Sequence, residues 1–158
     1  MELTEKEMEN VEQQMATIGY MLANYEKFGE DALKVANKYF YELGKSMGQS
    51  VKEKMGIKGS GPNAVAAVMS AILEKVGTKP TIKIEGDKVI IENAGFCPVM
   101  EAVRIMNAPW ELVCRNYSWR WFEGIAAGVN PNVTMEVPES RIWGGNRCYH
   151  VMNVPKIE

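Results

Sequence analysis

The sequence of 158 residues predicts an α+β domain in which N-terminal helices pack with a small antiparallel sheet. Apolar residues recur at helical spacing through the first half of the chain. The pattern changes to alternation at residues 81–92, and alternation returns after residue 132, beyond a second helical region. We therefore predict the order ααα-ββ-αα-ββ in a single domain, 1–158, with a helical half (1–78) and a second half (79–158) that holds a hairpin, a helix pair and the C-terminal strands.

Two helices are predicted before residue 55. Thr4-Glu5-Lys6-Glu7 matches a capping box, which begins a helix by satisfying its first free amides. Gly29 interrupts this helix, and Asp31 is a suitable N-cap for the next one. Gly44 and Gly48 lie one turn apart in the second helix, so we expect another helix to approach it closely there. Its predicted apolar stripe is Val35, Tyr39, Leu43, Met47 and Val51.

A third helix and a β-hairpin follow. The helix is predicted over 63–76, because Gly59-Ser60-Gly61-Pro62 breaks the chain before it and Gly77 suits its C-terminal end. Residues 81–85 and 88–92 then form two short β-rich runs. The Gly86-Asp87 pair between them is typical of a tight hairpin turn.

The rest of the chain predicts two helices and two strands. Proline is favoured in a first helical turn, so a short helix begins after Cys97-Pro98 and runs to about Met106. A longer helix is predicted over 109–128. The alternation at 133–137 and the run 147–154, joined across Gly144-Gly145-Asn146, predict the last two strands.

Composition limits the classes of function. Hydrophobic residues make up 46% of the chain, enough to bury a core, but no apolar run approaches the roughly 18 residues that span a bilayer. The net charge of −2 and the scattered lysines and arginines do not favour nucleic acid as a partner. The charged beginning of the chain does not resemble a secretory signal, and three cysteines cannot all pair with one another. We expect a cytoplasmic protein without a membrane span.

All three cysteines and the only histidine fall in the C-terminal half. Thiolate and imidazole are preferred zinc ligands, and a set of three cysteines and one histidine suits tetrahedral zinc better than iron. Cys148 and His150 are two apart in a predicted strand, so they point to the same face. The sequence has no C-x-x-C motif, so folding would have to bring the ligands together. We predict a zinc site, with iron as the second choice of metal, formed by Cys97, Cys114, Cys148 and His150.

Two other interpretations of the cysteines stay open. Free cysteines are most often buried, inert apolar residues. Alternatively, Cys97 lies at the start of a predicted helix, whose dipole favours thiolate and lowers the pKa of the thiol. Cys97 would then be a nucleophile with His150 as its base, and Glu101 is the nearest acidic residue that could orient the pair.

The predicted helix over 109–128 is rich in aromatic residues. Tyr117 and Trp121 share a face with Cys114, whereas Trp119 and Phe122 lie on other faces. Apolar residues on several faces favour a core contact combined with a homodimer interface. An aromatic wall of a ligand pocket is the alternative.

Four of the arginines in the same half of the chain are candidates, and one of them could pair with a carboxylate or phosphate of a ligand, although arginines exposed to solvent are commoner. They are Arg115, Arg120, Arg141 and Arg147. We predict Tyr117, Trp121 and Arg147 as ligand-binding residues.

The C-terminal half resembles two families over about residues 93–153. The shared features are Cys97-Pro98 before a helix, Cys114 in the next helix, Phe122-Glu123-Gly124, and the ending Gly144-Gly145-Asn146-Arg147-Cys148-Tyr149-His150. They resemble the 4-vinyl reductase domain family and the L-2-amino-thiazoline-4-carboxylic acid hydrolase-like family. The ending departs from the pattern of these families, because Gly145-Asn146 replaces Gly-Asp, only Arg147 precedes Cys148, and His150 stands where phenylalanine is usual.

The resemblance implies an α+β fold shared with haem-based nitric oxide sensors and trafficking-particle subunits. Such domains often dimerise and bind small or hydrophobic molecules, and a zinc role is suspected for the cysteines of the 4-vinyl reductase domains. The other family name implies ring-opening hydrolysis.

The predicted function is therefore a domain that binds or senses a small apolar or heterocyclic molecule, with a cysteine-based metal site. The alternative is a hydrolase that acts on a C–N or C–S bond of a small heterocycle such as an aminothiazoline carboxylate, with Cys97 as nucleophile or a bound metal that activates water. A third interpretation is a structural subunit of a larger complex.

Overall fold

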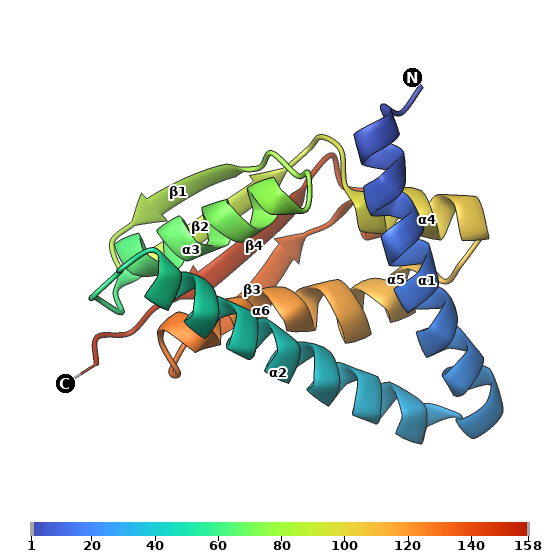
Figure 1. Cartoon of the computed structure of the whole chain (residues 1–158), viewed down its shortest axis with the longest axis horizontal. Coiled ribbons are helices and arrows are strands. Elements are labelled where there is room, and N and C mark those ends of the chain that lie inside the picture. The colour runs from blue at the N-terminus through green and yellow to red at the C-terminus, as the bar shows by residue number, and fades with distance from the viewer. Residues whose placement is uncertain (1, 158) are drawn as a thin grey trace.

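The computed structural model describes residues 2–157 and confirms the predicted α+β fold and its element order (Figure 1). Three helices precede a β-hairpin, and a second helical region separates the hairpin from the last two strands. The elements are α1 (Glu5–Phe28), α2 (Glu30–Lys54), α3 (Pro62–Lys75), β1 (Thr81–Glu85), β2 (Lys88–Asn93), α4 (Pro98–Met106), α5 (Trp110–Val113), a π-helical turn (Cys114–Ser118), α6 (Trp119–Val129), β3 (Thr134–Glu139), a 3₁₀ turn (Arg141–Trp143) and β4 (Cys148–Asn153).

Helices α1 and α2 form a V whose apex is Gly29 (Figure 1). The predicted capping box is present, since the Thr4 hydroxyl accepts from the Glu7 amide and the Glu7 carboxylate accepts from the Thr4 amide. Gly29 has φ of 70°, a conformation that favours glycine, and it caps α2. The prediction of Asp31 as the N-cap is therefore wrong. Asp31 lies within the first turn of α2, where it pairs with Lys34.

A glycine seam joins α2 to α6, as the spacing of Gly44 and Gly48 predicts. A Cβ on Gly44 would overlap the carbonyl oxygen of Trp121, and one on Gly48 would overlap that of Ile125. Gly124 and Gly128 of α6 have the same relation to backbone carbonyls of α2. Only glycine at these four positions lets the two helix backbones come so close.

The four strands form one antiparallel sheet in the order β1-β2-β4-β3. The predicted hairpin pairs Glu85 with Lys88, and Gly86 in its turn has φ of 61°. Helices α3 and α6 pack against the sheet. The register of β3 against β4 shifts between Glu136 and Glu139, just before the chain enters the 3₁₀ turn. This irregularity interrupts the ladder beside the candidate site.

Two hydrophobic clusters make up the core. One joins α3 and α6 to strands β2 and β4, and the other joins α1, α4 and α5 to Phe40 of α2. Trp121 packs against both clusters. The candidate site lies where the two clusters meet.

The predicted apolar stripe of α2 is not buried as a whole. Val35 and Tyr39 are 70% and 58% exposed, because α2 turns Leu33, Phe40 and its glycines toward the rest of the protein instead. Val35 and Tyr39 line an open groove of about 630 Å³ between α1 and α2, called here the α1–α2 groove. Tyr20, Met21 and Phe28 of α1 also line it.

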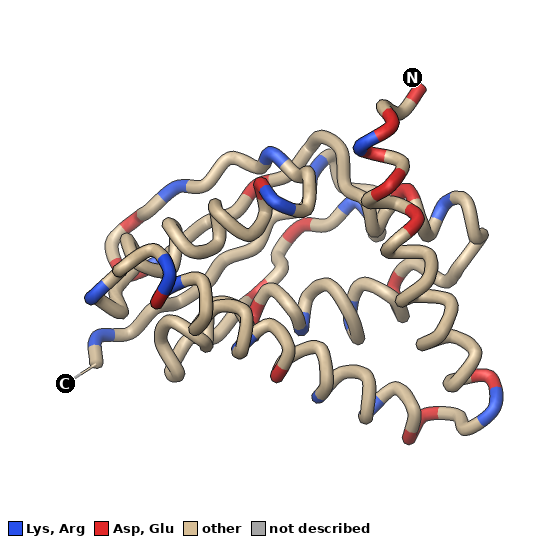
Figure 2. The backbone as a smooth tube through the Cα atoms, viewed as in Figure 1, with Lys and Arg blue, Asp and Glu red and all other residues tan. Residues whose placement is uncertain are grey.

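Charged residues are spread along the whole chain, and acidic residues are frequent in the first half of α1 (Figure 2). Among the helices of residues 2–157, none combines the length and the apolar character needed to cross a bilayer.

Candidate functional site

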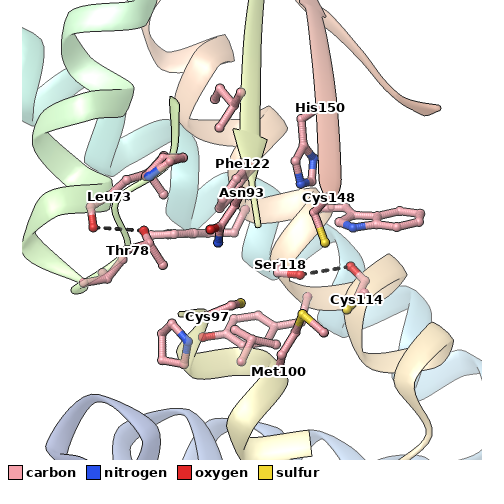
Figure 3. A pocket seen from close by; sticks show the side chains of 18 of the residues that line it. Leu73, Thr78, Asn93, Cys97, Met100, Cys114, Ser118, Phe122, Cys148 and His150 are labelled. Carbon is pink, nitrogen blue, oxygen red and sulfur yellow. Dashed lines mark hydrogen bonds between the residues drawn. The ribbon is translucent and has the colours of Figure 1, made fainter. Parts of the chain in front are cut away.

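A largely enclosed pocket of about 110 Å³ lies at the junction of the two hydrophobic clusters. Its wall is formed by aliphatic and aromatic side chains from α3, β2, α4, the π-helical turn and α6. Figure 3 shows Cys97 and Met100 on the α4 side, Cys114 and Ser118 on the helix, and Cys148 and His150 on the strand side. Residues from distant parts of the sequence thus share one small cavity.

All three cysteines line this pocket as free thiols. Cys97 is the N-cap residue of α4, Cys114 begins the π-helical turn, and Cys148 is the first residue of β4. Burial raises the pKa of the Cys114 thiol to about 12 and is also the main cause that raises the pKa of Cys97. The Met100 amide and the Arg141 guanidinium oppose this shift at Cys97 but do not outweigh it. The predicted lowering of the Cys97 pKa by the helix dipole therefore has the wrong sign.

His150 lies on the same face of β4 as Cys148, as strand alternation predicts. Its ring centroid lies 4.9 Å from that of Phe122, and the residue is 6% exposed. Its Nδ1 atom is buried and has no hydrogen-bond partner among the described residues. Burial lowers the pKa of His150 to about 4, so the imidazole is neutral at pH 7.

The predicted helix over 109–128 is present, but it contains the π-helical turn Cys114–Ser118. The Trp119 amide donates to the Cys114 carbonyl five residues earlier, which widens the helix at this point. Cys114, Tyr117 and Ser118 all line the pocket. The turn therefore shapes the pocket wall.

Tyr117 and Trp121 are in the pocket wall, as predicted. The Tyr117 hydroxyl donates to Gln14 Oε1 of α1, and burial raises the pKa of Tyr117 to about 12. The Trp121 Nε1 donates to the Met47 sulfur of α2 at 3.3 Å. These bonds hold both rings in place, and Gln14 itself belongs to the pocket wall.

Arg147 is not in the pocket. It precedes β4 and points to the opposite face from Cys148, where it pairs with Glu92 at 2.7 Å and Glu139 at 2.9 Å. The pocket arginine is instead Arg141 of the 3₁₀ turn. Arg147 therefore lies outside this pocket, and ligand binding by Arg147 stays a prediction.

The four predicted metal ligands line the same pocket, but they do not form a ligand set. Within residues 2–157, no three side chains of histidine, cysteine, aspartate or glutamate are arranged so that they could hold a metal ion. The arrangement does not fit the predicted zinc or iron site as it stands, and metal binding stays a prediction.

The predicted nucleophile and base lie on different sides of the pocket (Figure 3). Glu101, which could have oriented them, pairs with Arg104 at 2.8 Å and is not part of the pocket wall. Cys97 is held mainly as a thiol, and His150 Nδ1 has no partner in the described part of the chain. The arrangement lacks the hydrogen-bonded chain that activates a cysteine nucleophile.

Several pocket residues carry no signal in the sequence. Thr78 donates its hydroxyl proton to the Leu73 carbonyl at 3.0 Å, and Asn93 Oδ1 accepts from the Gly95 amide at 3.0 Å. Such contacts follow from loop conformation, which spacing does not reveal. Arg141 was considered from the sequence only as one of four candidate arginines.

No model of a known protein family matches the chain, and no curated protein matches it in sequence. One solved structure with a similar fold is trafficking protein particle complex subunit 3 from Naegleria fowleri, crystallised covalently bound to palmitic acid. The TM-score is 0.60 at 16% sequence identity, and the match covers 93% of this chain and 96% of that one. At this identity the likeness shows the fold, which is the fold that the resemblance in the sequence implies.

Proposed function

We propose that this protein binds a small, largely apolar molecule in the pocket that its three cysteines line. The observation that carries the proposal is the pocket itself, a largely enclosed cavity with an aromatic wall at the junction of two core clusters. Well-packed cores contain few voids larger than a water molecule. The structural neighbour with palmitic acid supports an apolar ligand for this fold.

The volume of the pocket limits the size of the ligand. A cavity of about 150 Å³ lined by apolar side chains is enough to bind benzene. The pocket of about 110 Å³ therefore suits a molecule of about one ring or a short chain. A sixteen-carbon chain such as that of palmitic acid would require the pocket to open.

Membership of the 4-vinyl reductase or aminothiazoline hydrolase-like family, zinc binding and hydrolysis of a heterocycle stay predictions. Protonated thiols and the absence of a partner for His150 Nδ1 within residues 2–157 favour binding over nucleophilic catalysis. Alkylation separates the two functions, because a protonated thiol reacts slowly with iodoacetamide and a catalytic thiolate reacts fast. Slow labelling of Cys97 is expected, and fast labelling that His150→Ala abolishes would favour the hydrolase.

Titration with toluene tests the proposal. Trp121 and Trp119 line the pocket, so their fluorescence should change on binding, with saturation in the micromolar to millimolar range. Cys148→Phe should abolish binding because the larger side chain fills the cavity. Cys148→Ser is the matched control, and it should still bind because it keeps the size of the side chain. Toluene binding that Cys148→Phe leaves unchanged, or no binding of any apolar probe of this size to the wild type, would contradict the proposal.

A further inference from the structure

Arg141 is the one arginine of the five in this chain without a carboxylate partner in residues 2–157. The other four pair with glutamates at 2.7–2.9 Å. Arg141 instead donates from Nη1 to the Gly95 carbonyl at 2.9 Å, which fixes the guanidinium against the loop before α4. The structure thus holds this cation in place without neutralising it.

Two nitrogens of Arg141 are buried and have no partner in the described part of the chain, namely Nε and Nη2. These nitrogens lie on the same edge of the guanidinium plane. Their two N–H groups form the fork that a carboxylate accepts with both oxygens. Buried N–H groups of a cation are costly to leave unpaired, so a free fork indicates a missing acceptor.

The surroundings of this fork define what the acceptor would be. Arg141 lines the pocket beside Cys97 and Cys148, and the pocket wall contains no aspartate or glutamate. Arg141 is also the only lysine or arginine in that wall. One cation in an otherwise apolar cavity matches one negative charge, which suits a monocarboxylate better than a phosphate dianion.

His150 adds a second unpaired polar group to the same cavity. Its Nδ1 is buried and has no partner among residues 2–157, and its side chain points into the pocket (Figure 3). A ligand that carries a polar atom away from its carboxylate could pair with this nitrogen. Tyr117, Trp121 and Phe122 provide the apolar surface between the two polar groups.

We propose that the ligand is a small monocarboxylate whose two oxygens accept hydrogen bonds from Arg141 Nε and Nη2 while its apolar body packs on Trp121 and Phe122. This inference rests on the proposed function, since it assigns the ligand class of the same pocket. Arg141 then acts as the residue that selects acids over neutral molecules of the same shape.

Two matched ligand pairs test the inference, benzoate with benzamide and hexanoate with hexanol. Each is titrated at pH 7 into the full-length protein by calorimetry or ligand-observed NMR. In at least one pair the acid should bind at least about tenfold tighter than its neutral partner, because only the acid fills the fork. Equal affinity within both pairs would overturn the inference and leave the proposed function standing. If none of the four ligands nor toluene binds, the proposed function fails as well.

Variants identify the residue responsible. Arg141→Met keeps an unbranched apolar stem but removes the fork, so it should weaken binding of the acid about tenfold and leave the neutral partner within about twofold. Arg141→Lys should retain part of the preference, because it keeps the charge without the fork. Arg104→Met is the matched control, since Arg104 lies outside the pocket in an exposed pair with Glu101. A preference for the acid that survives in a folded Arg141→Met variant would overturn the assignment of Arg141 as the selecting residue. If that variant does not fold, the comparison of the ligand pairs on the wild type still decides the ligand class.

Discussion

Protonation of His150 should destabilise the folded protein. Because His150 is the only histidine, its effect can be separated from the titration of the carboxylates. Burial lowers the pKa of His150 to about 4, whereas an unfolded histidine has a pKa of about 6.5. The unfolded chain therefore takes up the proton at a higher pH than the folded protein does. The contribution of His150 to the unfolding free energy is fully present above a pH of about 6.5 and is lost as the pH falls toward about 4.

The size of the loss follows from the two pKa values. A difference of about 2.5 units, at about 1.4 kcal/mol per unit, corresponds to about 3 kcal/mol of unfolding free energy. For a chain of this length, about 1 kcal/mol shifts the melting temperature by about 2–4 °C. The His150 contribution alone should therefore lower the melting temperature by about 6–12 °C between pH 7.5 and pH 4.

Urea unfolding of wild type and His150→Phe at pH 7.5 and pH 4 measures this contribution. Phenylalanine keeps a ring against Phe122 and cannot titrate. Carboxylates titrate in both proteins, so the difference between the two pH dependences isolates the histidine. The wild type should lose about 3 kcal/mol more than the variant. Parallel losses, within about 1 kcal/mol, would refute the account of His150 as a neutral side chain buried in the pocket.

Three further predictions concern the fold, the assembly and the metal. Gly44→Ala should lower the unfolding free energy by about 1–3 kcal/mol in thermal melts, because its Cβ would overlap the backbone of α6. Gly19→Ala in α1 is the control: its Cβ meets only the Met106 methyl at 3.5 Å, so the unfolding free energy should rise by up to about 1 kcal/mol. Equal effects of the two substitutions would contradict the glycine seam. The homodimer predicted from the aromatic helix over 109–128 should give a dimer mass by light scattering at micromolar concentration; a wild-type monomer mass would count against it. The zinc prediction requires about one metal ion per chain in protein purified without oxygen, and loss of most of it in Cys114→Ser; metal-free protein with three titratable thiols would disprove it.

The elements of the fold were predictable because their signals are local. The capping box at Thr4–Glu7 and the hairpin turn at Gly86-Asp87 each depend on residues within one turn of the chain. The glycine pair Gly44 and Gly48 predicted a close helix contact but not its partner, since α6 lies far along the sequence. The spacing of the glycines identifies the helix face that packs closely, whereas only the tertiary structure shows which helix packs against it.

The candidate site was predictable in its thiols and its histidine but not in its arginine. Strand alternation placed Cys148 and His150 on one face, and helical spacing placed Cys114 with Trp121. Arg141 reaches the pocket through the register shift of β3 and the 3₁₀ turn after it, which no periodic pattern reveals. The pKa of Cys97 was expected to fall because the helix start is visible in sequence, whereas the burial that raises it is not.

Methionine methyl NMR tests the central claim most directly, because two methionines report on the two apolar cavities. Met100 lines the pocket with the cysteines, and Met21 lines the α1–α2 groove. Titration of protein labelled with ¹³C at the methionine methyls should shift the Met100 resonance with toluene and leave that of Met21 in place. Binding that shifts Met21 and not Met100 would contradict the assignment of the thiol-lined pocket as the ligand site.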